Sequence, residues 1–308
     1  VSVPEAARRE MGELNGPGLL SLELVEDPRS HFVLLRVEPQ DDPAQFFDDL
    51  RQGAKGSNSA FVFVHGYNVS FEDAARRTAQ LKIDLQFGGA PIFYSWPSKA
   101  ATLDYTRDES SIEWAIPHLH AFLLALRREL PDTRIHLLAH SMGNRALAGA
   151  LQRFARDLNA RTTAERLRGF DEVVLAAPDI DAETFRAELF PAMRSGADGF
   201  TLYACEQDKA LVVSAGVHGW KRVGQEAAAF VTLEGLESIQ VALRTSLLDD
   251  VLALGHSYYG DVSTVLEDVR KTLAGRGPES AERQGGGLVA RPGGSWSLDG
   301  NIGPPSAP

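Results

Sequence analysis

A serine lies between two small residues, where a short apolar run gives way to a helical pattern. The run is Ile135 to Leu138, and Ser141 follows it, with Ala139 two positions before the serine and Gly143 two positions after it. A serine on such a tight turn between a strand and a helix is typical of a nucleophile elbow, which presents the hydroxyl for covalent catalysis. Alanine replaces the usual first glycine, so the strict G-x-S-x-G pattern is not met.

A serine hydroxyl needs a general base to act as a nucleophile at neutral pH, and the base needs an acid that orients it. Two histidines follow the serine, His218 and His256. His256 stands in a glycine-containing loop before the last helical pattern, where the base belongs when the order is Ser, Asp, His. His218 is close to the end of an expected helix, and we interpret it as a helix-terminal or surface residue.

Two aspartates compete for the role of the acid. Asp208 ends the expected strand that comes two after the nucleophile strand, which is the usual position, and Asp179 ends the strand immediately after it, which is the alternative. We expect Asp208 to be the acid. An aspartate before a helix can also be only its N-cap, and this interpretation stays open for both residues.

The oxyanion of a tetrahedral intermediate needs backbone donors that are already in place. We expect one from the N–H of Met142, and a second from Tyr67 or Asn68 in the loop after the strand at 60–64. His65, Tyr94, Trp96 and Tyr258 are candidates for the wall of a substrate pocket, although aromatic residues at such positions are equally often core. His140 is interpreted as a packing residue or as part of the pocket wall.

The composition limits the class of partner. The chain has 308 residues, 44% of them hydrophobic, a formal net charge of −11 and one cysteine, Cys205. The negative charge disfavours nucleic acid and anionic membranes as partners. Neither an H-E-x-x-H pair nor a cysteine cluster suggests a metal, and no glycine-rich phosphate loop suggests a nucleotide, so we expect no cofactor. No apolar run is long enough to span a membrane, and we expect a cytoplasmic protein, or an exported one whose leader has been removed.

Buried strands alternate with helices along most of the chain. We expect strands at 60–64, 91–95, 135–138, 172–177, 199–205 and 230–233, and helices after each of the first five. This order predicts an α/β fold with a mainly parallel sheet and helices on both faces. Ligands bind such sheets at the carboxyl ends of the strands, where the polar residues named above all fall.

The two ends of the chain are expected to differ from this pattern. Alternating residues in 18–38 predict an antiparallel hairpin at the edge of the sheet. The long segment between Phe230 and His256 is expected to form either a lid over an apolar pocket or a packed helix. Asp261 is expected to cap the last helix. We expect a single domain over 1–274, followed by a Gly/Pro-rich and mostly disordered tail over 275–308.

Five segments together resemble a bacterial family of α/β hydrolases of unknown function. They are Phe63–Asn68, Tyr94–Ser98, Ala139–Asn144, Ala176–Asp179 and Tyr203–Leu211, within a similarity that covers about residues 55–273. The resemblance implies the α/β-hydrolase fold and serine hydrolase machinery at Ser141, Asp208 and His256. It implies no particular substrate.

The sequence therefore predicts an enzyme that cleaves small-molecule carboxylic esters through an acyl-enzyme on Ser141. A thioesterase, an amidase or an acyltransferase would use the same residues. The alternative from another class is a non-catalytic α/β-hydrolase scaffold that binds a ligand or a protein.

Overall fold

A mainly parallel sheet forms the centre of the protein. The computed structural model describes residues 1–5, 9–14, 26–98, 105–160, 167–230, 233–243 and 257–300. Within these residues eight strands lie in the order β2-β1-β3-β4-β5-β6-β8-β7, and all neighbouring pairs are parallel except β7 and β8. The strands are β1 Ser59–Val64, β2 Ala90–Tyr94, β3 Arg134–His140, β4 Phe170–Ala176, β5 Ala197–Ala204, β6 Leu236–Leu243, β7 Leu288–Ala290 and β8 Trp296–Gly300.

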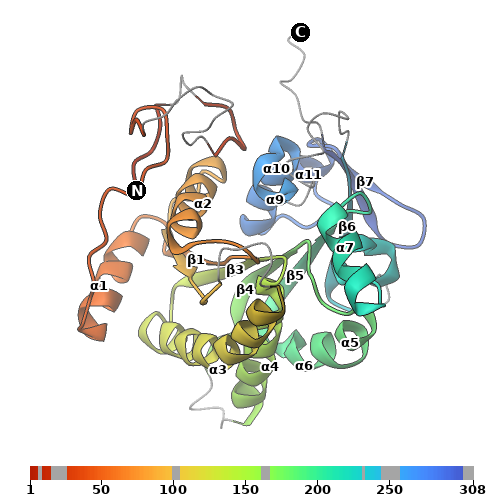
Figure 1. Cartoon of the computed structure of the whole chain (residues 1–308), viewed down its shortest axis with the longest axis horizontal. Coiled ribbons are helices and arrows are strands. Elements are labelled where there is room, and N and C mark those ends of the chain that lie inside the picture. Colours follow the sequence, from red (N-terminus) through yellow and green to blue (C-terminus); the bar gives the residue numbers. More distant parts are fainter. Residues whose placement is uncertain are drawn as a thin grey trace.

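Helices cover both faces of this sheet (Figure 1). They are α1 Pro43–Ala54, α2 Phe71–Asp84, α3 Tyr105–Glu129, α4 Gly143–Ala160, α5 Ala182–Thr184, α6 Phe190–Met193, α7 Lys209–His218, α9 Tyr258–Asp261, α10 Ser263–Leu273 and α11 Ala281–Gln284. A π-helical turn, Phe185–Leu189, joins α5 to α6, and short 3-10 turns span Arg194–Gly196, Val223–Gln225 and Ala227–Phe230. The predicted α/β-hydrolase class and mainly parallel sheet are confirmed.

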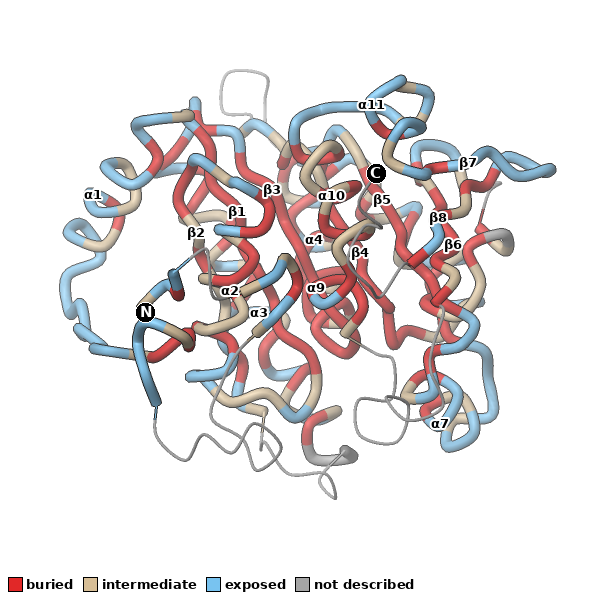
Figure 2. The backbone as a smooth tube through the Cα atoms, turned by 90° about the horizontal axis from the view of Figure 1, so that it is seen from above, coloured by how far each residue is buried: buried red, intermediate tan, exposed pale blue. Residues whose placement is uncertain are grey.

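Each central strand buries both of its faces, which explains why the strand sequences are continuously apolar. In β1, Val62 and Val64 join the apolar cluster beneath α3 and α4, whereas Phe61 and Phe63 join the cluster beneath α2 and α10. Figure 2 shows the central strands as buried backbone with the exposed segments around them. The two clusters hold the strands in one rigid layer, so their carboxyl ends form a fixed edge.

The expected N-terminal hairpin is wrong for the part that the structure describes. Residues 26–38 form no strand there, and residues 18–25 lie outside the described residues. The buried side chains of Phe32 and Val33 account for the apolar pattern, because the backbone beside them pairs with Ser2 rather than with the sheet. The Ser2 N–H donates to the Val33 carbonyl at 2.8 Å, and the Val33 N–H donates to the Ser2 hydroxyl at 2.9 Å.

The strand that precedes the loop of the predicted general base, His256, was predicted at the wrong place. Phe230 ends a 3-10 turn, and the strand is β6, within the segment expected to be a lid or a helix. Ile239, Val241 and Leu243 of β6 pack into one apolar cluster between β5 and β8. Apolar residues at every second position are therefore those of a strand, and β6 is paired with β5 on one side and with β8 on the other.

The predicted disordered tail is also wrong, over residues 276–300. This segment forms α11, β7 and β8, and β8 pairs with β6 inside the sheet. Residues 301–308 lie outside the described residues. A further correction concerns Asp261, which ends α9 and forms an ion pair with Arg77 at 2.8 Å, whereas Val262 is the N-cap of α10.

A buried arginine fastens the C-terminal segment to the sheet. Arg283 of α11 is fully buried and donates to both carboxylate oxygens of Asp268 at 2.9 and 2.8 Å. It also donates to Glu237 of β6 at 2.9 Å, and Tyr203 donates its hydroxyl to Asp268 at 2.7 Å. A guanidinium that satisfies the buried Asp268 and the partly buried Glu237 explains why a glycine-rich segment with few large apolar residues is nevertheless folded.

We predict that Arg283→Met lowers the free energy of unfolding by about 3–5 kcal/mol, because the buried Asp268 and the partly buried Glu237 would lose their partner. Urea denaturation followed by circular dichroism measures the loss. Arg276→Met is the control, since that side chain is largely exposed and its ion pair with Glu282 spans 3.5 Å. A change of about 0.5 kcal/mol or less is expected there. Equal losses in the two variants would contradict the role of Arg283.

Candidate active site

Ser141 occupies a strained turn between β3 and α4. Its φ is +51°, in the left-handed region that residues other than glycine rarely adopt. The turn is held from the neighbouring strand, because the Ser141 N–H donates to the Ala176 carbonyl at 3.0 Å. Asn144 adds a side-chain clamp, donating to the Ser141 and Ala176 carbonyls at 3.0 Å each. The local geometry is therefore that of a nucleophile elbow.

Gly143 makes this turn possible. A Cβ at Gly143 would lie 2.3 Å from the His65 carbonyl oxygen and 2.7 Å from that of Val64. These are backbone atoms at the end of β1, so they cannot rotate away. The first turn of α4 consequently packs directly on the loop that follows β1.

The same close packing brings the β1 loop next to the serine. A Cβ at Gly66 would lie 3.0 Å from the Ser141 Cβ. Met142 precedes the first residue of α4, and among the described residues its N–H donates no hydrogen bond to a backbone carbonyl. Asn68 has a φ of +57°, so the loop turns sharply after Tyr67. The predicted oxyanion residues thus belong to two segments that the fold brings into contact.

His65 supports this loop through its ring and its carbonyl. The ring stacks on Trp96 with centroids 5.1 Å apart, and the Trp96 indole donates to the His65 carbonyl at 2.7 Å. Burial lowers the pKa of His65 below its ordinary value, although hydrogen bonds to the backbone oppose this effect. A neutral, stacked ring suits a supporting role for both residues at the base of the site.

The predicted pocket tyrosines lie in different places. The Tyr94 hydroxyl donates to the Ala115 carbonyl at 3.4 Å, and the ring is 6.0 Å from that of Phe122. Tyr258 is buried on the opposite face of the sheet and donates to the Tyr203 carbonyl at 2.9 Å. His140 stacks on Tyr259 with centroids 4.3 Å apart. These contacts are those of packed core residues.

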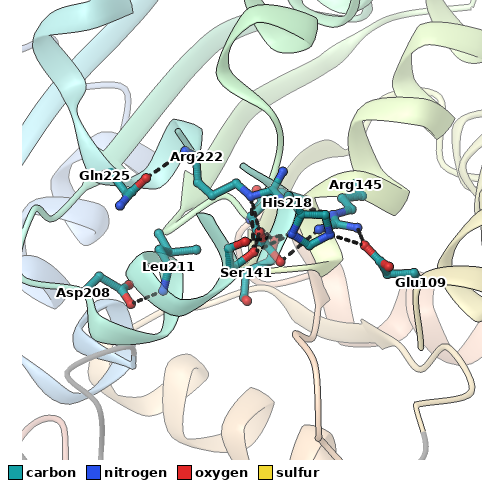
Figure 3. Close-up of polar contacts among 11 residues, drawn as sticks. Glu109, Ser141, Arg145, Asp208, Leu211, His218, Arg222 and Gln225 are labelled. Carbon is teal, nitrogen blue, oxygen red and sulfur yellow. Dashed lines mark hydrogen bonds and ion pairs between the residues drawn. The ribbon is translucent and has the colours of Figure 1, made fainter. Parts of the chain in front are cut away.

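The two candidate acids have different surroundings. Asp208 is fully buried after β5 and caps α7, its carboxylate accepting the Leu211 N–H at 3.1 Å (Figure 3). Asp179 follows β4 and is also buried, but its carboxylate contacts three side chains. One oxygen accepts the Ser214 hydroxyl at 2.7 Å and lies 3.2 Å from Arg222 Nε, and the other accepts from Arg145 at 3.1 Å.

Asp179 belongs to an ion cluster that was not anticipated from the sequence. Glu109 of α3 accepts from Arg145 at 2.7 Å and contacts the His218 ring at 2.8 Å (Figure 3). Burial opposes ionisation of Glu109, but the hydrogen bonds from Arg145 and His218 outweigh it and lower the carboxyl pKa. The Asp179 N–H donates to the Ser141 carbonyl at 3.3 Å, which joins the cluster to the serine turn. The residue that could have indicated this cluster in the sequence is Arg145, which lies one helical turn after Ser141.

The predicted base, His256, lies outside the described residues. The residues that are described at the carboxyl ends of β1, β3, β4 and β5 meet at one edge of the sheet, as expected. Among the described residues, no group of three His, Cys, Asp or Glu side chains is arranged to hold a metal ion. In the same part of the chain, no helix combines the length and the apolar character needed to cross a membrane.

Comparison with known proteins agrees with this geometry. The model of a protein family described as "alpha/beta hydrolase of unknown function" matches residues 42–275. A stretch of 108 residues is 29% identical to an uncharacterised protein, alr1448, of Nostoc sp.. That similarity covers 27% of this chain and 28% of the Nostoc protein.

We predict that Gly143→Ala destabilises the protein and displaces Ser141, because the new methyl group would overlap two backbone carbonyls. Thermal unfolding measures the loss. Gly216→Ala is the matched control in another helix, where nothing lies within 4 Å of the added Cβ. For Gly216→Ala we expect the free energy of unfolding to rise by about 0.5–1 kcal/mol, because alanine has the higher helix propensity. Similar unfolding temperatures for the two variants would contradict the packing argument.

Proposed function

Because the chain belongs to this family of α/β hydrolases, we propose that it is a serine hydrolase that cleaves carboxylic esters through an acyl-enzyme on Ser141. The observation that carries the proposal is the positive φ of Ser141 between a parallel strand and a helix. A serine is kept in such a conformation only when the surrounding structure imposes it, and such strain concentrates at functional sites.

In the proposed mechanism, His256 takes the proton of the Ser141 hydroxyl as the oxygen attacks the ester carbonyl. Asp208 holds the imidazole in the required tautomer and compensates its charge. The N–H of Met142, with that of Tyr67 or Asn68, receives the developing oxyanion. His256 then protonates the leaving alcohol, and a water molecule that it activates hydrolyses the acyl-enzyme.

The ion cluster around Asp179 supports Asp208 as the acid. Arg145 and Arg222 already compensate the negative charge of the Asp179 carboxylate. An imidazolium beside this carboxylate would therefore add a third positive charge. We assign Asp179 to positioning, because its N–H holds the Ser141 carbonyl while its side chain anchors α4 and α7. The substrate in this proposal is a small-molecule ester.

We predict that a fluorophosphonate probe labels the wild-type protein at one site and does not label Ser141→Ala. The probe reacts only with a serine whose hydroxyl is activated by a base, so labelling tests the nucleophile without knowledge of the substrate. Peptide mass spectrometry identifies the modified residue. An unlabelled wild-type protein that is folded by circular dichroism would favour the non-catalytic scaffold.

We predict that Asp208→Asn lowers kcat on p-nitrophenyl butyrate by about 10³–10⁴-fold, because the base loses its orienting charge. Asp179→Asn is the matched comparison. It should retain far more turnover and lose thermal stability instead, since the buried Arg222 and the partly buried Arg145 lose their carboxylate. The reverse ranking of kcat would assign the acid role to Asp179.

A further inference from the structure

Helix α7 is apolar on nearly every side, yet one face of it is open to solvent. Its sequence is KALVVSAGVH, and a helix without a polar face is ordinarily enclosed by other elements. Val212, Val213 and Val217 are 51%, 64% and 69% exposed, and Trp220, directly after the helix, is 69% exposed. Figure 2 shows α7 at the margin of the molecule.

The exposure does not come from a loosely attached helix. Leu211 and Ser214, on the opposite side of α7, are buried. Ser214 donates to Asp179, and His218 contacts Glu109. The inner side of α7 is therefore fixed to the ion cluster, while the outer side presents Val212, Val213, Val217 and Trp220, which we call the α7 patch.

The backbone beside the α7 patch is open as well. Within the part of the chain that the structure describes, nothing lies within 4 Å of an added Cβ at Gly216 or Gly219, so these two positions next to the valines and Trp220 are open as well. Contiguous exposed apolar surface on a protein marks an interaction site. Tryptophan in particular is favoured at the boundary between water and lipid.

The size of the patch disfavours a stable dimer as its occupant. A standard protein interface buries about 800 Å² on each partner, and even a large aromatic side chain supplies only about 150–250 Å². Three valines and one tryptophan fall well short of that area. A lipid surface has no such requirement, because partial immersion of a short apolar face is sufficient for reversible binding.

Charge identifies the kind of lipid surface. The chain carries a net charge of −11, which opposes approach to an anionic membrane. Near the patch, the exposed Lys221 is paired with Glu226 at 3.1 Å, so its positive charge is compensated within the protein. A surface of uncharged, zwitterionic phospholipid meets the apolar face without this repulsion.

We propose that the α7 patch docks the protein on the surface of a zwitterionic phospholipid layer. Asp208 is the N-cap of α7, and the inner side of the helix contacts the ion cluster around Asp179, so the docked surface belongs to a helix that borders the candidate active site. The docking does not depend on hydrolysis. Combined with the proposed function, it favours esters that reside in lipid over freely soluble esters.

The test is flotation of the full chain with phosphatidylcholine vesicles. The double variant Val213→Lys/Val217→Lys should lower the bound fraction at least tenfold, because two lysines would have to be desolvated. The matched control is Val289→Lys, a valine on β7 that is 59% exposed and lies outside the patch, and it should bind as the wild type does. Vesicles should shift the tryptophan fluorescence of the wild type to shorter wavelengths. This shift should be absent in Trp220→Phe.

Several outcomes would overturn the proposal. They are no flotation of the wild type, equal flotation of the double variant, or binding to phosphatidylglycerol vesicles alone. A dimer in sedimentation velocity that the double variant abolishes would instead assign the patch to a second copy of the chain. Fluorophosphonate labelling of every variant tests whether the candidate active site at Ser141 is intact. Flotation needs no turnover, so the docking proposal and the hydrolase proposal can fail independently of each other.

Discussion

The contact between the first turn of α4 and the end of β1 is the constraint on which the site depends. A side chain as small as a methyl group at Gly143 would collide with the carbonyls of Val64 and His65. Close approach at this point forces the chain through the left-handed conformation at Ser141 and places the β1 loop beside it. The strain at the serine is offset by hydrogen bonds to its backbone from β4 and from Asn144. The turn at Ser141 and the position of the β1 loop beside it are thus two consequences of one packing contact.

A second layer of organisation fixes this contact from the side of the helices. Arg145 projects from α4 to Asp179 after β4 and to Glu109 on α3, and His218 on α7 shares Glu109. Buried ion pairs are weak evidence for stability, but they impose a definite geometry on the elements that they connect. Here the connected elements are those that border Ser141. The cluster therefore ties the placement of α3, α4 and α7 to the position of the serine.

The sequence was sufficient where structure is determined locally. Continuous apolar runs located β1 to β5 to within a few residues, and the small residues around Ser141 identified the turn. It was insufficient where an element is stabilised by distant partners. The strand β8 lies in a glycine-rich stretch and folds because β6 pairs with it and Arg283 reaches Asp268 and Glu237. The ion cluster escaped notice for the same reason, since Glu109, Arg145 and His218 are far apart along the chain and lie on three helices.

Asp179 and Asp208 illustrate how identical side chains can have different environments. Both follow parallel strands, both are buried, and each stands where an acid could be placed. Two guanidinium groups and a hydroxyl surround Asp179, so its charge is committed to holding α4 and α7 in place. Asp208 caps α7, and its carboxylate accepts the Leu211 N–H at 3.1 Å. Residue type and order along the chain cannot separate the two aspartates, whereas the cations that surround one of them can.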